Sequence, residues 1–382
     1  MKILFISMPS IHFIRWVENL KQTDYELYWF DVLRRGEIGE LYFVSQFTGW
    51  KKRKIKYIKG EYFLSKKTPL LYEKINRYLE VSANEALDKI ILEIQPDVIH
   101  SFEMQSCSYP ILRTMTKHMY IKWIYSCWGN DLYYYKNFPS HSKKIKNVLQ
   151  RIDFLHTDCE RDFVLAKQLG FSGQHVGVIP GGTGYKLNEL EKNKLPISER
   201  KIILVKGYDH KFGRGLKVLE ALNLLQNEIN NYDVVVFGAH QKVIDYVKLN
   251  NLNFKVYNRN GLSHTQLMEL MGKSLFYIGN SISDGMANTL LEAIVMGAFP
   301  IQSNPGNVTA EIIEHGVNGL LINNPESIIE IRDLILKAID SGNIWETSFK
   351  KNQEIALQKL DYTMNQNKVI EIYKILQNAN RI

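Results

Sequence analysis

The chain has 382 residues, more than one ordinary hydrophobic core accommodates, and this length indicates two domains. Hydrophobic residues make up 45% of the chain and charged residues 23%, which is typical of a globular protein, and no apolar run approaches the roughly 18 residues of a membrane span. The formal net charge of +8 favours polyanions, anionic membranes or phosphorylated substrates as partners.

The first residues and the cysteines indicate the compartment. "MKILFIS" has one Lys, a short apolar run and no small-residue cleavage site after it, which predicts a buried first strand rather than a signal peptide. Cys107, Cys127 and Cys159 are widely spaced and form no C-x-x-C, which indicates neither a disulfide framework nor a zinc site. We therefore expect a cytoplasmic protein.

Apolar runs alternate with amphipathic stretches in the first half of the chain. The strands predicted there are "KILFIS", "ELYWFDV", "PDVIHSF", "YIKWIYSCW" and "DFLHTD". The predicted helices cover 12–22, 70–95, 105–118, 141–151 and 160–169. This alternation is typical of a parallel sheet covered by helices on both faces.

The alternation pauses at 180–200, where Gly, Pro and charged residues predict a linker, and then resumes. The second set of predicted strands is "KIILVKG", "DVVVFG", "NFKVYN", "SLFYIGN", "AFPIQS" and "GLLI". Its predicted helices cover 214–228, 240–250, 263–272, 287–296 and 325–340. The polar, helical tail 345–379 is long enough to return to the first domain, so the pattern predicts two α/β domains in tandem.

A basic stretch at 49–67 interrupts the pattern. It combines eight cations with aromatic side chains: Lys51, Lys52, Arg53, Lys54, Lys56, Lys59, Lys66 and Lys67 with Trp50, Tyr57, Tyr62 and Phe63. Cations mixed with amphipathic aromatics suit an anionic membrane surface. A solvated loop or helix face is an equally strong interpretation, because charge runs are usually surface.

The segment 280–303, "NSISDGMANTLLEAIVMGAFPIQS", carries the strongest candidate site. Its loop runs from a predicted strand into a helix, and ligands of open parallel sheets bind where strands end and helices begin. The first turn of such a helix accepts phosphate through its N–H groups and its dipole. Gly285 permits close approach, and Thr289 adds a hydroxyl. Asp284 has an alternative role as the N-cap of the helix.

Glu292 lies within the apolar run "LLEAIV" of the same helix. A charge on such a helix is costly unless it has a partner. Its carboxylate is suited to accept hydrogen bonds from both hydroxyls of a ribose. A buried ion pair with a Lys or Arg from elsewhere is the alternative.

Positive charge for a diphosphate is expected from "VKGYDHKFGRG". Lys206 ends a predicted strand there, and Arg214 begins a helix, so both are candidates to bind phosphate oxygens. The alternative interpretation is a Gly-rich turn with surface cations.

These motifs together resemble glycosyltransferase family 4, the group 1 glycosyltransferases. The family pattern E-x7-E, followed by a helix, a Gly, a strand and G-x-x-E-x-x-x-x-G-x-x-G, is similar to 284–319, with Asp284 in place of the first Glu, Glu292 as the second and Glu311 downstream. "VKGYDHKFGRG" is similar to the phosphate-binding segment, although Tyr208 follows Gly207 where the family has Gly-Arg. The first half of the chain also contains four segments in the order that the family shows: "SIHFIRWVENL", "IQPDVIHSFE", "WGNDLYYY" and "VIPGGTGY".

The resemblance implies a GT-B fold: two Rossmann-like α/β domains with parallel sheets facing across a cleft and a C-terminal helix that crosses back to the first domain. The implied ranges are 1–185 for an acceptor domain, 186–200 for a linker, 201–358 for a nucleotide-sugar domain and 359–382 for the returning helix. The implied activity is retaining transfer of a sugar from a nucleotide-diphosphate sugar, most simply UDP or GDP linked, without a metal or other cofactor.

The resemblance also assigns site residues. Glu292 would bind the ribose, and the loop Gly285, Met286, Ala287, Asn288 and Thr289 the diphosphate. The segment 258–262, "NRNGL", would contact the base, with Asn260, Gly261 and Leu262 as its named residues. Asp284, Lys206 and Arg214 are the implied catalytic residues. Ser10, His12, Trp128 and Asp131 are the implied acceptor or sugar pocket, and each of them has an alternative as a packed or capping residue.

The expected partners are a nucleotide sugar, a glycan or lipid-linked acceptor and an anionic membrane surface, in bacterial surface polysaccharide or lipopolysaccharide synthesis at the inner face of the plasma membrane. A non-catalytic nucleotide-sugar-binding protein of the same fold is the first alternative. A nucleic-acid binder is the second, but the basic run is local and no nucleic-acid motif accompanies it, so nucleic acid is not an expected partner.

Overall fold

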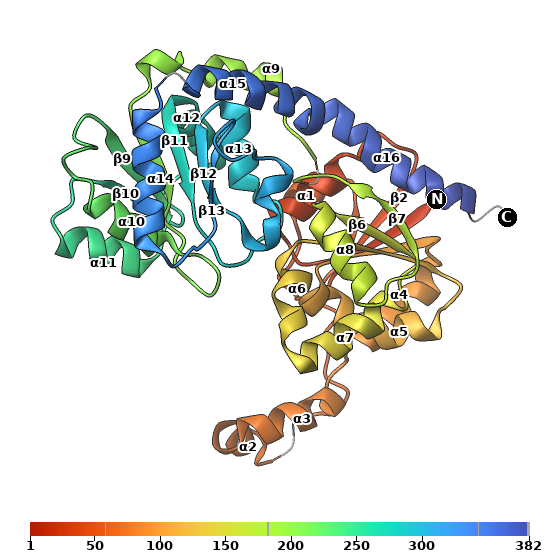
Figure 1. Ribbon diagram of the computed structural model, residues 1–382. Coiled ribbons are helices and arrows are strands. Elements are labelled where there is room, and N and C mark those ends of the chain that lie inside the picture. Colours follow the sequence, from red (N-terminus) through yellow and green to blue (C-terminus); the bar gives the residue numbers. More distant parts are fainter. Residues whose placement is uncertain (58, 182, 343, 380–382) are drawn as a thin grey trace. The chain divides into compact units, whose positions relative to one another are not determined.

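The computed structural model describes residues 1–57, 59–181, 183–342 and 344–379. The chain divides into two compact units (Figure 1). The first unit contains Met1–Thr157, Phe163–Gly177 and the C-terminal segment from Val369, and the second contains Asp158–Asp162 and Val178–Lys368. The last three residues of the expected returning helix, 380–382, lie outside the described residues.

The first unit is built on a seven-stranded sheet in the order β3-β2-β1-β4-β5-β6-β7. Its strands are β1 (Lys2–Ser7), β2 (Glu26–Asp31), β3 (Ser45–Phe47), β4 (Val98–Phe102), β5 (Lys122–Cys127), β6 (Phe154–Thr157) and β7 (Gln174–Val178). β1 pairs in parallel with β2 and β4, so the strands end at a common carboxyl edge.

Helices connect these strands. They are α1 (Ile11–Glu18), α2 (Glu61–Lys67), α3 (Pro69–Leu79), α4 (Ala83–Ile94), α5 (Leu112–Lys117), α6 (Asn130–Tyr133), α7 (Pro139–Leu149) and α8 (Glu160–Gln168), with short turns η1 (Gly39–Leu41), η2 (Met104–Ser108), η3 (Tyr109–Ile111) and η4 (Tyr135–Asn137). Alternate residues of β1 face opposite sides of the sheet, as the strand period of two requires. Leu4 and Ile6 pack in the core with α4 and α7, whereas Phe5 contacts the rings of Phe13 and Tyr373.

The second unit contains a six-stranded sheet in the order β10-β9-β8-β11-β12-β13. Its strands are β8 (Ile202–Lys206), β9 (Asp233–Ala239), β10 (Lys255–Asn258), β11 (Ser274–Gly279), β12 (Phe299–Ser303) and β13 (Leu320–Ile322). Ile203 and Val205 pack in one core cluster and Leu204 in the other, so apolar side chains cover both faces. Such near-continuous apolar strands are typical of parallel sheets buried on both sides.

The helices of the second unit follow the same alternation. They are α9 (Leu187–Leu190), α10 (Gly215–Asn223), α11 (Gln241–Leu249), α12 (His264–Lys273), α13 (Asn288–Met296), α14 (Ile328–Asp340) and α15 (Ile344–Ile355), with short segments η5 (Glu191–Asn193), η6 (Ile197–Glu199), η7 (Pro305–Asn307), η8 (Thr309–Glu311) and η9 (Ala356–Leu360). The last helix, α16 (Tyr362–Ala379), begins in this unit and belongs to the first unit from Val369 onward. In the described residues, none of the helices combines the length and the hydropathy that crossing a bilayer requires.

The structure confirms two Rossmann-like parallel sheets and corrects the expected elements in detail. The helix predicted over 70–95 is two helices, because Glu80 and Ser82 adopt extended backbone and Ser82 caps α4. β3 and β7, both short, were not predicted. The linker region 180–200 contains α9 and two short turns.

The end of α16 belongs to the first unit, where Tyr373 is fully buried. Its hydroxyl accepts a hydrogen bond from Trp16 Nε1 at 2.8 Å and lies 2.7 Å from His100 Nδ1. His100 Nε2 lies 2.8 Å from the Ser126 hydroxyl, which lies 2.9 Å from His156 Nδ1. This buried polar chain fixes the C-terminal segment in the core of the first unit.

Candidate active site

Two loops meet at the carboxyl edge of the second sheet. β8 and β11 are neighbours, and the segments that follow them are 206–214 and 280–287. The backbone N–H of Arg214 donates to the carbonyl of Asn280 at 2.9 Å. The structure therefore brings the expected phosphate-binding segment together with the loop that leads into α13.

The start of α13 is not capped by a side chain. The N-cap is Ala287, which supplies no side-chain hydrogen bond, and the helix begins at Asn288. Asp284 stands earlier in the loop, where its Oδ1 accepts the N–H of Gly285 at 3.0 Å, so the alternative of Asp284 as the N-cap is not observed. An uncapped first turn leaves its positive end available to an anion.

Glu292 is buried in α13, and its Oε1 lies 2.8 Å from Nε2 of His264. The expected alternative was a Lys or Arg partner, and the structure supplies an imidazole instead. One turn earlier, the hydroxyl of Thr289 accepts a hydrogen bond from Tyr277 at 2.8 Å. Burial raises the pKa of the Tyr277 phenol, which therefore remains a donor.

Cations gather around Tyr208 in the same unit. Lys206 Nζ lies 4.9 Å and the guanidinium of Arg259 5.9 Å from the centre of the Tyr208 ring. Arg214 forms an ion pair with Glu326 and donates to the carbonyl of Gly213 at 2.8 Å. Arg259 was not expected as a site residue, although it lies inside the predicted base-binding segment "NRNGL".

The segment expected to contact a base follows β10 at the same carboxyl edge. The N–H of Asn260 donates to the side chain of Asn258 at 3.1 Å, and the N–H of Gly261 donates to the Asn258 carbonyl at 3.0 Å. Asn260 and Gly261 are exposed, and Leu262 is partly buried against the core. This tight turn holds the segment before α12, whose first residue is His264.

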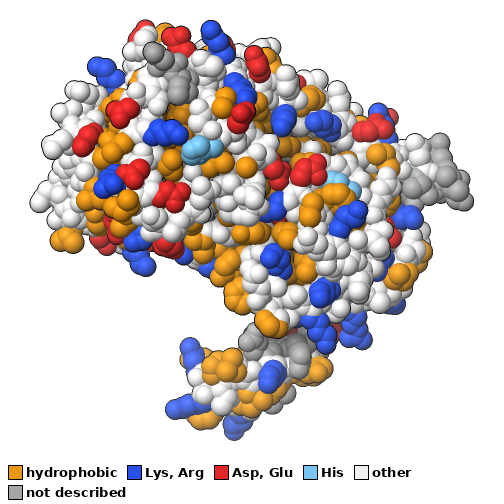
Figure 2. Space-filling model, in the orientation of Figure 1, with side chains coloured by type: hydrophobic (Ala, Val, Ile, Leu, Met, Phe, Trp, Pro, Cys, Tyr) orange, Lys and Arg blue, Asp and Glu red, His pale blue; other side chains and the backbone are white. Residues whose placement is uncertain are grey.

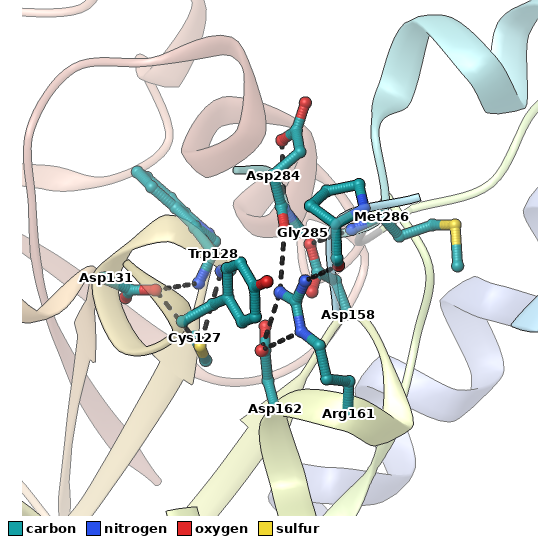
Figure 3. A network of polar contacts seen from close by, with 12 residues as sticks. Cys127, Trp128, Asp131, Asp158, Arg161, Asp162, Asp284, Gly285 and Met286 are labelled. Carbon is teal, nitrogen blue, oxygen red and sulfur yellow. Dashed lines mark hydrogen bonds and ion pairs between the residues drawn. The ribbon is translucent and has the colours of Figure 1, made fainter. Parts of the chain in front are cut away.

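Arg161 holds the loop before α13 from a distant part of the sequence (Figure 3). Its Nη2 donates to the carbonyl of Asp284 at 2.8 Å, and its Nη1 donates to the carbonyl of Pro305 at 2.8 Å. Its Nε donates to the buried carboxylate of Asp162 at 2.9 Å. Glu311, from the family-like motif, accepts the backbone N–H of Arg161 at 2.9 Å. No local pattern indicates this role of Arg161, because Asp284, Pro305 and Glu311 lie more than a hundred residues away in the sequence.

Asp158 contacts the same loop. Its Oδ2 accepts the N–H of Met286 at 3.2 Å, and a β-carbon at Gly285 would lie 2.5 Å from that oxygen, so a side chain there would displace the Asp158 carboxylate. Ligand atoms of Asp158, Cys159 and Asp162 lie within 4.8 Å of one another. The guanidinium of Arg161 already meets the charge of Asp162, and burial raises the pKa of the Cys159 thiol, so this group is poorly suited to a metal ion.

Ser10, His12 and Trp128 follow strands of the first sheet at its carboxyl edge. Ser10 caps α1 by accepting the N–H of Phe13 at 3.2 Å, which supports its capping alternative. His12 is exposed, and its ring lies 5.5 Å from that of the half-buried Trp128. The structure therefore brings together these two residues of the expected acceptor pocket.

Asp131 has a different environment (Figure 3). It is buried, and its carboxylate accepts hydrogen bonds from the Tyr125 hydroxyl at 2.5 Å, the Met104 N–H at 3.2 Å and the Trp128 N–H at 3.1 Å. The Cys127 thiol donates to it at 3.1 Å. Burial raises the pKa of this carboxyl, opposed by these hydrogen bonds. The arrangement supports the alternative of a packed residue that fixes the loop after β5.

Glu103 directly follows β4 and was not singled out in the sequence. Its backbone has φ 69° and ψ 142°, a region that side-chain-bearing residues rarely adopt. Its carboxylate caps η2 by accepting the N–H groups of Gln105 at 2.9 Å and Ser106 at 2.5 Å. Burial, and then the nearby charge of Asp131, raise the pKa of Glu103 to about 7. The only sequence signal was a Glu directly after a buried strand.

Family models match both parts of the chain. Residues 188–356 match the model of glycosyl transferases group 1, and residues 2–158 match the model of glycosyl transferase 4-like domains. The chain is a glycosyltransferase of the GT-B fold. A search of curated proteins finds no match.

Solved structures share the fold of this glycosyltransferase across almost its whole length. HepE from Anabaena in complex with UDP is 16% identical, covering 98% of this chain and 100% of that chain with a TM-score of 0.69. A glycosyltransferase from Rickettsia africae is 16% identical, covering 98% of both chains with a TM-score of 0.67. Sucrose-phosphate synthase from Thermosynechococcus elongatus is 15% identical, covering 99% of this chain and 100% of that chain with a TM-score of 0.71.

Proposed function

We propose that this glycosyltransferase retains anomeric configuration and transfers a sugar from a UDP or GDP sugar to a glycan or lipid-linked acceptor. The acceptor belongs to bacterial surface polysaccharide or lipopolysaccharide synthesis at the cytoplasmic face of the membrane. HepE from Anabaena, which has a similar fold, has been solved with UDP, with UDP and glucose and with UDP-glucose. That similarity supports a nucleotide sugar as the donor.

The observation that carries this proposal is the buried carboxylate of Glu292 in a helix whose first turn has no side-chain cap. In the proposal, Glu292 accepts hydrogen bonds from the two ribose hydroxyls. The loop from Gly285 to Thr289 binds the diphosphate at the positive end of α13. The segment 260–262 contacts the base, at the same carboxyl edge of the sheet.

The proposed chemistry is stabilisation of the leaving group. Breaking the bond between the sugar and the nucleotide develops negative charge on the diphosphate, and fixed N–H groups and cations at that point lower the barrier. Lys206 meets this charge in the proposal. Arg214 joins it when it leaves Glu326, its present partner. Asp284 contacts the hydroxyls of the transferred sugar, no protein nucleophile takes part, and the reaction requires no metal.

The acceptor binds in the first unit in this proposal, against His12 and Trp128. The two rings form an aromatic wall at the carboxyl edge of the first sheet. Aromatic faces pack well against the apolar faces of sugars, and the exposed imidazole offers a hydrogen bond to an acceptor hydroxyl. The protein associates peripherally with the membrane that carries the acceptor.

Ligand-dependent thermal stability and product analysis test the donor proposal together. A nucleotide that binds the native state raises Tm, so UDP, GDP, ADP and their sugars are compared at equal concentration. We expect a UDP or GDP sugar to give the largest rise in Tm. We also expect transfer to release the nucleotide and to give an α-linked product from an α-linked donor. Glu292→Ala should weaken donor binding by about 1.5–3 kcal/mol, the range for charge-assisted hydrogen bonds. Donor affinity that is unchanged in a folded Glu292→Ala protein would contradict the assignment.

A further inference from the structure

Helices α2 and α3 form a hairpin that projects from the sheet of the first unit (Figure 1). Glu61, buried at the start of α2, holds the hairpin together. Its carboxylate accepts hydrogen bonds from both Nη atoms of Arg53, at 2.8 and 2.9 Å, and from the hydroxyl of Tyr72 at 2.7 Å. The hairpin is therefore an ordered element fixed at its base by a paired charge.

The hairpin exposes large apolar side chains. On α3, Leu71, Ile75 and Tyr78 recur at the spacing of one helical face, and all three are exposed. On and before α2, Tyr57, Tyr62 and Phe63 are exposed as well. Figure 2 shows hydrophobic side chains next to Lys and Arg side chains over this element. An exposed apolar face rimmed by cations is unusual for solvated surface and suits the interface of an anionic bilayer.

The structure changes which cations are expected to face lipid. Within the basic stretch 49–67, of which residue 58 lies outside the described residues, Lys51 pairs with Glu80, Arg53 with Glu61 and Lys54 with Glu85. These three cations hold the base of the hairpin. Lys66 and Lys67 instead lie over the exposed rings of Tyr62 and Phe63, at 5.7 and 6.0 Å from the ring centres.

A pocket of about 510 Å³ opens at the foot of the hairpin. Among the described side chains, three cations line it, Arg34, Lys51 and Lys74, together with one carboxylate, Glu80, which pairs with Lys51. Trp50, Val81 and Ser82 also line it. The pocket lies beside the end of β2, since Arg34 follows that strand by three residues. Arg34 adopts a left-handed backbone with φ 59°, a strained conformation for this residue.

We propose that this pocket binds the phosphate of a lipid-borne acceptor while the exposed face of the hairpin contacts the bilayer that carries it. The inference rests on the lipid-linked acceptor of the proposed function and names its recognition element. A phosphate ester carries about −1.5 to −2 charges at neutral pH, and the cations of the lining are complementary to it. Arg34 supplies planar donors for phosphate oxygens, and Lys74 adds a charge from α3.

Vesicle binding of the full chain tests this proposal. One set of vesicles contains phosphatidylcholine with a polyprenyl phosphate, and the other contains phosphatidylcholine with phosphatidylglycerol at matched surface charge. The wild type should bind the polyprenyl phosphate vesicles about tenfold more tightly, and Arg34→Gln with Lys74→Gln should remove that preference. The matched control, Lys66→Gln with Lys67→Gln, removes the same charge outside the pocket and should weaken binding to both vesicles equally.

Three results would overturn the proposal. They are a wild type without preference for polyprenyl phosphate, a pocket variant that keeps the preference, and inorganic phosphate that abolishes the preference at the concentration of the lipid phosphate. The last result would assign the pocket to free phosphate. Replacing Leu71 and Ile75 with Ser should weaken binding to both vesicles, and unchanged binding would exclude the hairpin as the lipid contact. UDP binding measured on the same proteins separates this outcome from failure of the donor proposal, since UDP does not require the hairpin.

Discussion

Asp131 in the first unit and Glu292 in the second are carboxylates with almost the same burial, 2% and 4% exposed. Asp131 is enclosed by two backbone N–H groups, a buried phenol and a buried thiol. Glu292 lies against His264, whose side chain is 49% exposed. One carboxylate is held by the interior of its unit and the other by a group at the surface.

This difference indicates how a buried charge is related to function. The desolvation cost of a carboxylate is offset in either case by hydrogen bonds. When the donors belong to the buried loop itself, as at Asp131, the carboxylate shapes the loop. When the donor lies at the surface beside an uncapped helix, as at Glu292, a ligand hydroxyl can reach the same oxygens. Burial alone does not distinguish the two.

The largest effect expected from this comparison is on stability at Asp131. Asp131→Ala leaves the Tyr125 hydroxyl and two N–H groups without their acceptor, and we expect unfolding of the first unit to become easier by about 3 kcal/mol. Five of the six Trp residues belong to that unit, so urea unfolding followed by Trp fluorescence reports it. UDP affinity should not change. Asp131→Asn, which keeps an acceptor, is the control and should lose less stability. A folded Asp131→Ala protein with lost UDP affinity and unchanged stability would contradict the structural role of Asp131.

The next largest effect expected is a pH dependence of stability in the first unit, caused by two buried imidazoles. Burial, and then the nearby charge of His175, lower the pKa of His156 to about 3. Burial, and then the nearby charge of His156, lower the pKa of His100 well below its usual value. The folded unit keeps both imidazoles neutral, whereas the unfolded chain protonates them below a pKa of about 6.5. The free energy of unfolding is therefore highest above pH 6.5 and decreases as the pH falls below it. From pH 7 to 6 the two together should cost the first unit about 1.4 kcal/mol. His156→Gln should flatten this slope, and a slope that is unchanged in that variant would contradict the prediction.

Arg161 permits a matched comparison with Arg151. Arg161 donates to the carbonyls of Asp284 and Pro305 in the second unit, and Arg151 donates to the carbonyls of Met115, His118 and Ile121 in the first. Lys keeps the charge but loses the planar fork. Arg161→Lys should weaken UDP binding about fivefold, about 1 kcal/mol, because it loosens the loop before α13. Arg151→Lys should leave UDP binding unchanged in the same titration calorimetry; equal losses in both variants would remove the positioning role.

The smallest effect is expected from metal removal. Lys206 and the N–H groups of α13 meet the diphosphate charge in the proposed function, so transfer should survive EDTA within experimental error. Sugar transfer is measured with and without the chelator. Complete loss in EDTA that Mg²⁺ or Mn²⁺ restores would show that a metal supplies charge that we assign to the chain.

The two parallel sheets could be predicted from the sequence because most of their strands are continuous apolar runs separated by helices, as in β1 and β8. It did not reveal β3, which has three residues and a polar pattern, or the break between α3 and α4. Short elements depend on tertiary pairing more than on local propensity. Local motifs also picked out the loops 207–214 and 280–287, which the structure joins through the hydrogen bond from Arg214 to Asn280.

The remainder of the site depends on long-range contacts. Arg161 and Asp158 meet the loop 284–286 across more than 120 residues of sequence, and a single sequence carries no signal for that pairing. The contact between His264 and Glu292 was equally invisible in the sequence, since only the fold brings α12 beside α13. The basic stretch 49–67 was visible as composition, but which of its cations are paired was not.

The most direct test of the donor assignment is a thermodynamic cycle that joins Glu292 to the ribose. Titration calorimetry measures the affinity of UDP and of 2′-deoxy-UDP, or the GDP pair if GDP stabilises the protein more, for the wild type and for Glu292→Ala. We predict that the wild type loses about tenfold in affinity when the 2′-hydroxyl is removed, and that Glu292→Ala binds both nucleotides equally weakly. The same tenfold loss in both proteins would show that Glu292 does not contact the ribose and would contradict the account.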